Sequence, residues 1–185
     1  MEFKTDLNLE EDIKNIYALI RDIPDFPKPG IIFKDITPVL KTPWAFQKVI
    51  DYLANRYVGK KVDLVVGIES RGFILGSALA YKLGAGFVPI RKKGKLPYKT
   101  IKASYALEYG EDSIEIHIDA IEKGQKVVLI DDVLATGGTM SAAISLVEEL
   151  GGEILGVDFL LELTFLGGRK KIENRGYPVF SLIKV

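Results

Sequence analysis

VVLIDDVLATGGT, residues 127–139, joins an apolar run to two adjacent carboxylates and then to a loop of small and hydroxylic residues. The β-branched run before Asp131 predicts a buried strand. The next segment, GTMSAAISLVEELGG (138–152), has apolar residues at helical spacing and a glycine stop, so it predicts a helix. A buried strand that runs through a short loop into a helix is typical of a parallel sheet covered by helices on both faces.

The segments on either side repeat this alternation of strand and helix. Before the acidic pair, 62–69 predicts a strand, 71–84 a helix and 86–90 a strand; after it, 153–163 and 178–185 predict two more strands. The sequence therefore predicts an α/β fold, a mostly parallel twisted sheet flanked by helices, in a single domain over 1–185. In such sheets ligands bind beyond the carboxyl ends of the strands, where the acidic pair is expected.

The N-terminal segment is expected to be less regular. Asn8 with Glu11 resembles a capping box before an amphipathic helix over 9–22. The three prolines and the glycine of IPDFPKPG (23–30) end that helix. The next segment, IIFKDITPVL (31–40), is expected to be short and irregular.

A second helix and a hairpin complete the expected elements. Thr42-Pro43 predicts the start of a helix that ends near Gly59. RKKGKLPYKTIK (91–102) predicts an exposed, mobile loop. The segments 103–110 and 113–118 predict the two arms of a β-hairpin around Glu111-Asp112.

The composition is that of an ordinary globular chain of 185 residues, 48% hydrophobic and 27% charged. Lys plus Arg and Asp plus Glu both number 25, so the net charge is zero and gives no sign of nucleic-acid binding. The absence of cysteine excludes disulfides and thiolate sites and is compatible with the cytoplasm, where we expect the protein. No apolar run reaches membrane-spanning length, so we expect no membrane partner.

The residues that follow the predicted strand suit a sugar phosphate. Backbone N–H groups at a helix start are unpaired, the helix dipole favours an anion there, and Gly137-Gly138 lets the chain approach closely. Carboxylates only accept hydrogen bonds, so Asp131 and Asp132 suit ribose hydroxyls or a hard cation such as Mg²⁺. Taken alone, Gly-Gly-Thr is more often an ordinary helix start, and an adjacent pair of Asp residues can simply face solvent. An acidic pair followed by this glycine loop, directly after a buried strand, favours a functional site. The loop lacks the lysine of a Walker A loop and the glycine spacing of a dinucleotide fingerprint.

Five segments, in order along the chain, resemble one enzyme family. VVLIDDVLATGGT is similar to the ribose-phosphate motif of type I phosphoribosyltransferases, and the other four narrow the resemblance to the adenine phosphoribosyltransferases. These four are FPKPGIIFKDITPVL (26–40), GIESRGF (67–73), RKKGKLP (91–97) and SYALEYG (104–110). The resemblance implies transfer of a phosphoribosyl group from 5-phosphoribosyl 1-pyrophosphate (PRPP) to adenine, giving AMP and pyrophosphate in purine salvage. It also implies Mg²⁺ as cofactor, a homodimer, a small N-terminal hood (about 1–40) over a core (about 41–185), and a mobile loop.

The resemblance assigns the sugar-phosphate end of the site to the acidic motif. It places the 5′-phosphate on the loop 135–139, in agreement with the argument from the helix start. Asp131 and Asp132 are implied to hold the ribose hydroxyls, and Mg²⁺ is implied to be held mainly by pyrophosphate, with an indirect contact to these carboxylates. The phosphate loop consists of Ala135, Thr136, Gly137, Gly138 and Thr139.

The turn at Ser70 and Arg71 is implied to hold the pyrophosphate, which a forked guanidinium suits. The alternative is an arginine on the surface at a helix N-terminus, which the helix dipole disfavours. Lys95 is implied to reach the pyrophosphate when the basic loop closes, in some relatives from the neighbouring subunit. The other basic-loop lysines, Lys92, Lys93 and Lys99, are interpreted as a solvated face.

Glu108 and Tyr109 are the implied catalytic residues beside the reacting centre, together with Arg71. Glu108 is the candidate to exchange a proton with an adenine ring nitrogen, which needs a carboxyl pKa raised in a closed site. Tyr109 is the candidate to cover C1 of the ribose. Without the resemblance, both residues would be interpreted as ordinary hairpin positions.

Adenine binding is implied for Ile32, Phe33 and Lys34, with the ring of Phe33 stacked on the base. Backbone groups beside it would distinguish adenine from a 6-oxo purine, because a donor and an acceptor exchange places. Many relatives carry Arg at the position of Lys34. If the backbone of residue 34 makes the contact with adenine, this difference matters little for adenine affinity; if a guanidinium is needed, Lys34 weakens adenine binding. Leu163 is expected on the other face of the base, with a plain core position as the alternative.

Two other functions stay open from the sequence. A hypoxanthine or xanthine phosphoribosyltransferase would share the acidic motif, and the segments 26–35 and 104–110 are what favour adenine. A regulator that binds nucleic acid would need a basic face or an extra domain, and the net charge is zero. The single histidine, His117, lies on the polar face of an expected strand and is assigned no role.

Overall fold

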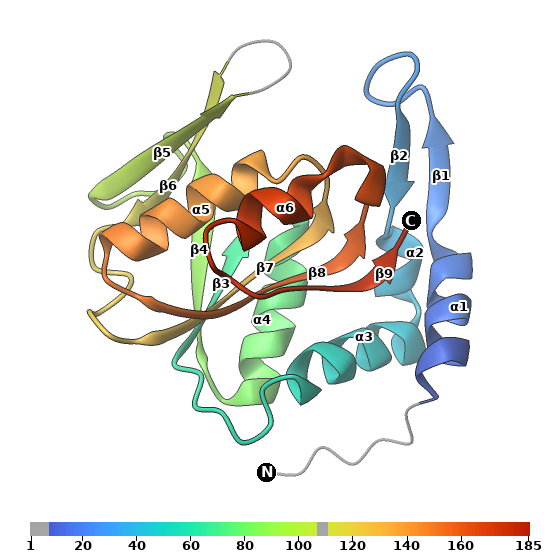
Figure 1. The fold of residues 1–185 in the computed structure, drawn as a ribbon, viewed down its shortest axis with the longest axis horizontal. Coiled ribbons are helices and arrows are strands. Elements are labelled where there is room, and N and C mark those ends of the chain that lie inside the picture. Colours follow the sequence, from blue (N-terminus) through green and yellow to red (C-terminus); the bar gives the residue numbers. More distant parts are fainter. Residues whose placement is uncertain (1–7, 107–110) are drawn as a thin grey trace.

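The computed structural model describes residues 8–106 and 111–185, and it is a central sheet between two layers of helices (Figure 1). The strands are β1 Arg21–Pro24, β2 Ile32–Asp35, β3 Leu64–Ile68, β4 Gly86–Lys92, β5 Thr100–Ala106, β6 Glu111–His117, β7 Lys126–Leu134, β8 Glu153–Glu162 and β9 Val179–Lys184. The helices are α1 Leu9–Leu19, α2 Thr37–Lys41, α3 Pro43–Asn55, α4 Arg71–Leu83, α5 Gly138–Glu149 and α6 Gly168–Glu173, with a 3₁₀ turn at Thr164–Leu166.

The main sheet has seven strands in the order β5-β6-β4-β3-β7-β8-β9. Each strand in the series β4, β3, β7, β8 and β9 is parallel to the next. β5 and β6 form an antiparallel hairpin, and β6 joins the sheet by pairing antiparallel with β4. The predicted α/β fold, with a mostly parallel sheet and one added hairpin, is confirmed.

Both faces of the sheet are covered because successive strand residues point to opposite sides. Val65, Val128 and Ile130 lie in one buried core, to which α1, α3 and α4 contribute. Val66 and Leu129 lie in a second core beneath α5 and α6. Burying an aliphatic side chain of this size contributes about 1.5–3 kcal/mol, so two-sided burial holds β3 and β7 firmly in place.

The order of the strands creates a crevice between β3 and β7. The chain passes from β3 to β4 on one side and later returns to β7 on the other, and ligands bind at such a reversal in open α/β sheets. The pairing of β3 with β7 stops at Ile130, but β7 continues along β8 as far as Leu134. Asp131 and Asp132 therefore lie inside β7, just past the end of its neighbour.

The N-terminal segment differs from the prediction. The helix ends at Leu19 because the next residues extend into β1, which pairs with β2 in a separate two-stranded antiparallel sheet. The segment 31–40 is not irregular, since it forms β2 and α2. The capping box was also wrong: the Asn8 amide donates to the Glu11 carboxylate at 2.9 Å and caps no backbone group.

The hairpin and the basic segment also differ from the prediction. β4 extends through Lys92 and β5 begins at Thr100, so the segment between these strands is shorter than expected. Glu111 and Asp112 belong to β6 rather than to a turn. Glu115, which alternates with buried isoleucines along β6, is itself buried, and its carboxylate accepts the N–H of Gly94 at 3.0 Å.

The prediction contained no helix between β8 and β9, where the structure has the 3₁₀ turn and α6. This helix has only six residues and begins at a Gly-Gly pair, so its sequence shows too little periodicity to identify it. The second predicted helix ends at Asn55 rather than near Gly59. Over the described parts of the chain, no helix combines the length and the apolarity needed to cross a bilayer.

Candidate active site

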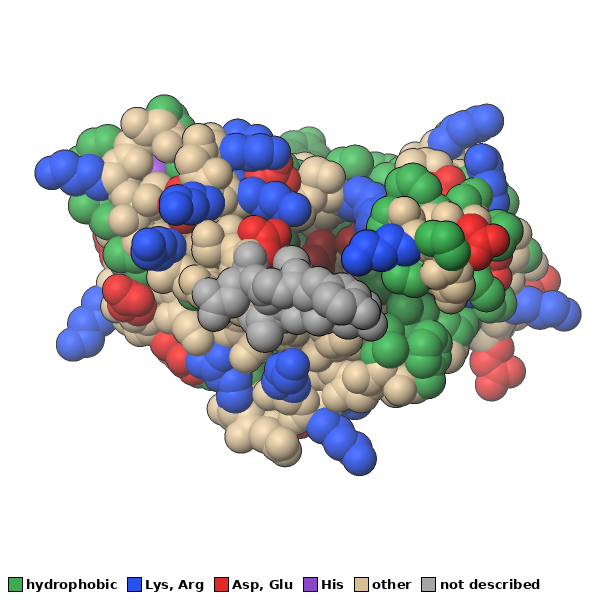
Figure 2. Space-filling model, turned by 90° about the horizontal axis from the view of Figure 1, so that it is seen from above, with side chains coloured by type: hydrophobic (Ala, Val, Ile, Leu, Met, Phe, Trp, Pro, Cys, Tyr) green, Lys and Arg blue, Asp and Glu red, His purple; other side chains and the backbone are tan. Residues whose placement is uncertain are grey.

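A groove of about 560 Å³ opens at the carboxyl ends of β3 and β7, between the β5–β6 hairpin and the β1–β2 sheet. Figure 2 looks onto this end of the molecule and shows a hollow with acidic side chains on its floor and Lys and Arg side chains on its rims. Most of the residues that the sequence assigned to a site, from widely separated segments, line this one groove. They are Ile32, Phe33, Lys34, Ser70, Arg71, Asp131, Asp132, Ala135, Thr139 and Leu163.

The acidic pair forms the floor of the groove. Asp132 is 5% exposed, and its Oδ2 lies 2.6 Å from Nε of Arg71, although outside hydrogen-bond geometry. Asp131 accepts the backbone N–H of Asp132 at 2.9 Å. Burial, and then the charge of Asp132, raise the pKa of Asp131 well above its ordinary range. Two carboxylates in this position therefore favour a nearby positive charge.

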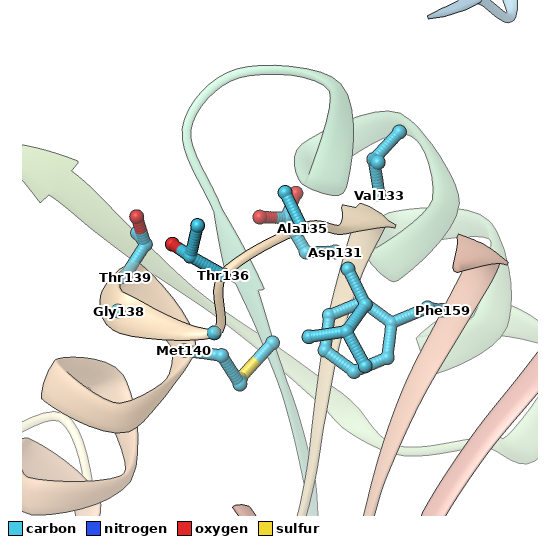
Figure 3. Close-up of a pocket in the computed structure, with 10 residues that line it drawn as sticks. Asp131, Val133, Ala135, Thr136, Gly138, Thr139, Met140 and Phe159 are labelled. Carbon is cyan, nitrogen blue, oxygen red and sulfur yellow. The ribbon is translucent and has the colours of Figure 1, made fainter. Parts of the chain in front are cut away.

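The loop after β7 forms a small pocket of about 80 Å³ that opens beside Asp131. Gly137 takes a left-handed conformation with φ of 75°, which lets the chain turn directly into α5. The amide of Ser141 donates to the Gly137 carbonyl at 2.9 Å, and the amides before it are those that a helix start leaves without an intrahelical partner. In Figure 3 the hydroxyl oxygens of Thr136 and Thr139 lie on the same side of the loop as the Asp131 carboxylate. This arrangement suits a phosphate group.

The turn from β3 to α4 lies opposite the phosphate loop. It carries a cis peptide bond between Glu69 and Ser70, and Ser70 occupies the N-cap position of α4 without a side-chain capping bond. Arg71, the first residue of α4, extends over the groove from Asp132 to Phe33, and its guanidinium carbon lies 4.7 Å from the centre of the Phe33 ring. The turn thus places one fixed cation above the acidic floor.

Glu69 organises the basic side of the groove, a role that the sequence analysis missed. Its carboxylate accepts hydrogen bonds from Nζ of Lys95 at 2.7 Å, from Arg91 at 3.3 Å and from the Lys92 amide at 3.0 Å. Burial acts to raise the pKa of Glu69, but these hydrogen bonds outweigh it and lower the pKa to about 2. The available signal was a carboxylate at the end of the predicted strand 62–69, directly before Ser70 and Arg71.

The β2 strand presents Phe33 to the groove, and Phe26 packs edge-on against this ring at 5.2 Å. The side chain of Lys34 is 15% exposed, and its Nζ donates to both carboxylate oxygens of Asp22 on β1, at 2.7 and 2.9 Å. That pairing favours the backbone, rather than the ammonium group, as the part of residue 34 that meets a ligand.

Other side chains line the groove without having been predicted, among them Leu166, Tyr105 and Lys92. Leu166, from the 3₁₀ turn, lies with Leu163 at the hood side and is 41% exposed. Tyr105 lines the hairpin side, and its hydroxyl donates to Asp112 at 3.1 Å. Lys92 is exposed, as expected from the sequence, and it also borders the groove. Lys95 is not among the lining residues of the groove, and Glu108 and Tyr109 lie outside the described residues.

Comparison with known proteins agrees with this geometry. A family model described as a phosphoribosyl transferase domain matches residues 36–183. An adenine phosphoribosyltransferase of Geobacter metallireducens is 62% identical over 173 residues, which cover 94% of this chain and 98% of that protein.

Solved structures resemble the whole fold. The crystal structure of an adenine phosphoribosyltransferase from Rhodothermus marinus has a TM-score of 0.91 at 53% identity, over 95% of this chain and 99% of that one. The enzyme from Saccharomyces cerevisiae, solved with adenine and an imino-altritol bisphosphate, has a TM-score of 0.87 at 44% identity, over 94% and 99%.

Proposed function

The chain belongs to the adenine phosphoribosyltransferases of the phosphoribosyl transferase family, and from this premise we propose how its groove performs their reaction. The enzyme transfers the phosphoribosyl group of PRPP to adenine, giving AMP and pyrophosphate. One observation carries the proposal: the phosphate loop, the acidic pair, the Arg71 turn and Phe33 all border one groove or the pocket that opens from it. That groove can align both substrates for direct transfer.

The phosphate loop would hold the 5′-phosphate of PRPP. The unpaired amides at the start of α5 and the hydroxyls of Thr136 and Thr139 are its donors, and the helix dipole favours the anion. Among the described residues, those that line the pocket include Ala135, Gly137 and Gly138 but no Lys or Arg, so recognition here would come from backbone and hydroxyl groups. This end of the site would position the sugar.

The acidic pair would hold the ribose 2′- and 3′-hydroxyls. Because the two carboxylates repel each other in a buried site, they would also stabilise positive charge that develops on the sugar as pyrophosphate leaves. Water would have to be excluded at that stage.

Mg²⁺ fits the donors present. Within the described residues no group of three or more His, Cys, Asp or Glu side chains converges on one point, and Mg²⁺ is commonly held by one or two carboxylates with substrate phosphates and water. Asp131 and Asp132 would contact it, directly or through water, while pyrophosphate supplies the other oxygens. Bound there, the ion would neutralise charge on the leaving group.

The pyrophosphate would lie at the Ser70–Arg71 turn, with Lys95 as a second cation. Arg71 can offer two parallel N–H groups to phosphate oxygens. Lys95 lies 2.7 Å from Glu69, immediately before this turn, so it is already near the site that it would neutralise. These cations would stabilise the charge of the departing group.

Adenine would stack on Phe33, with Leu163 against its other face and backbone groups of Ile32 and Lys34 reading its edge. Arg71 lies against the Phe33 ring in the structure, so the guanidinium would have to share or leave this place when the base binds. Glu108 and Tyr109 stay part of the proposal as the groups beside the base nitrogen and ribose C1.

We further propose a homodimer in the cytoplasm, with residues up to about 40 as a hood over the core. Ile74 and Tyr81 lie two turns apart on α4 and are 44% and 90% exposed, which supports an apolar contact with a second copy. PRPP carries several negative charges and does not cross a lipid bilayer unaided, which supports a cytoplasmic site of action.

The test is AMP formation from PRPP with adenine, hypoxanthine or guanine, each with and without Mg²⁺. We expect AMP with adenine and Mg²⁺, and no nucleotide product with either 6-oxo purine. Nucleotide formation from hypoxanthine at an equal rate would contradict the proposed base site. Full activity after chelation of Mg²⁺ would contradict the proposed role of the ion.

A further inference from the structure

The phosphate loop rests on the first residue of α6. Gly168 is buried, and a Cβ atom placed on it would lie 2.2 Å from the carbonyl oxygen of Ala135, 2.8 Å from the amide nitrogen of Gly137 and 2.9 Å from the carbonyl carbon of Thr136. Real Cβ atoms essentially never approach other atoms within 3.0 Å. Position 168 therefore excludes every side chain while the loop keeps its present course.

The contact is reciprocal. A Cβ atom on Gly137 would lie 2.8 Å from the carbonyl oxygen of Gly168 and 3.2 Å from its Cα. Both partners are backbone, so no flexible side chain can move aside, unlike at Gly86, where the nearest atom is the end of the Leu64 side chain. Two glycines thus let two backbones touch directly beneath the phosphate pocket.

The segment that carries Gly168 cannot easily retreat. Arg169, the next residue, donates to the Glu162 carboxylate at 2.9 Å and to the Val179 carbonyl at 2.8 Å, and Glu162 is 3% exposed. At the other end of α6, Arg175 donates to the Ser141 carbonyl at 2.6 Å. These bonds attach the helix to β8, β9 and α5, so an added side chain at 168 would displace the phosphate loop instead.

We propose that Gly168 is a positioning residue for the sugar-phosphate end of the site. It contacts no substrate itself, but it fixes the position of the loop whose amides would bind the 5′-phosphate. This inference rests on the function proposed above. A misplacement of reacting groups by about 1 Å can cost about 100-fold in rate, and the 2.2 Å contact requires a shift of that size.

The test is Gly168→Ala, assayed for binding of AMP and of adenosine, which differ only in the 5′-phosphate. We expect AMP affinity to fall about 10- to 100-fold while adenosine affinity changes less than 2-fold, with a matching rise in KM for PRPP. Gly167→Ala is the matched control, because a Cβ there meets nothing within 4 Å, although its φ of 69° adds some strain. The control should leave the ratio of AMP to adenosine affinity unchanged.

A second variant tests the same inference if Gly168→Ala folds poorly. Arg169→Lys adds no volume but loses the forked contact with Glu162, so it should loosen α6 and weaken AMP selectively by a smaller factor. Equal losses of AMP and adenosine affinity in both variants, or the same selective loss in Gly167→Ala, would overturn the inference. Absence of AMP formation by the unmodified enzyme would instead count against the proposed function.

Discussion

Replacing Glu69 by Gln removes the charge that holds the basic side of the groove together. The carboxylate is 12% exposed and binds Lys95, Arg91 and the Lys92 amide. Its pKa falls from 4.5 to about 2, and at about 1.4 kcal/mol per pH unit the ionised carboxylate stabilises the folded state by roughly 3 kcal/mol. Because the folded-state pKa is the lower one, this stabilisation is present above pH 4.5 and is lost as the pH falls towards 2.

The assay is urea unfolding of both proteins at several values between pH 7 and pH 2. Trp44, the single tryptophan, lies at the start of α3 and can report unfolding by fluorescence. We expect Glu69→Gln to lower the free energy of unfolding by up to about 3 kcal/mol at pH 7, and the difference from the unmodified protein to vanish near pH 2. Glu122→Gln, at an exposed position, is the control and should show no such trend. A difference that is the same at pH 3 and pH 7 would refute the reasoning.

Three other outcomes are expected. Asp132→Asn should lower kcat/KM for AMP formation at least about 100-fold while the melting temperature shifts by only a few degrees; near-normal turnover would exclude a role in the reaction. Phe33→Ala should raise KM for adenine about 10- to 100-fold, since a base–aromatic stack contributes about 1–3 kcal/mol, and an unchanged KM would place the base elsewhere. Burial raises the pKa of Asp158 from 3.8 to about 6, so ionisation costs the folded state about 3 kcal/mol as the pH rises through that window. In urea unfolding, Asp158→Asn should therefore be more stable relative to the unmodified protein at pH 7 than at pH 4. An equal difference in the free energy of unfolding at both pH values would contradict this.

The parts of the fold that the sequence predicted are those with strong local signals. The strand β7, the helix α4 and the loop between β7 and α5 were expected close to their observed bounds, because apolar runs and glycine stops identify them over short distances. β1, β2, α2 and α6 were missed. β1 ends at Pro24, β2 follows a proline-rich segment, and these two strands need each other as partners; α2 and α6 are too short to show a period.

The residues of the candidate site also divide into those that the sequence predicted and those that it missed. Residue types after a predicted strand identified the acidic pair and the phosphate loop, whereas the family resemblance pointed to the Ser70–Arg71 turn. The same reasoning missed Tyr105 and Leu166, because an aromatic or an aliphatic residue carries no chemical signature until its neighbours are known. The family resemblance, rather than spacing, pointed to Phe33.

By itself, the sequence determined the alternation of strands and helices and the chemical groups available at each strand end. Only the tertiary structure decided which of these groups meet: Arg71 with Asp132, Glu69 with Lys95, and Gly168 with Ala135. The physical reason is the distance along the chain over which each effect acts. Propensity and periodicity act over a few residues, whereas these contacts depend on strand register and on helices packed from distant parts of the chain. The exclusion of a side chain at Gly168 exists only because another backbone passes within contact distance.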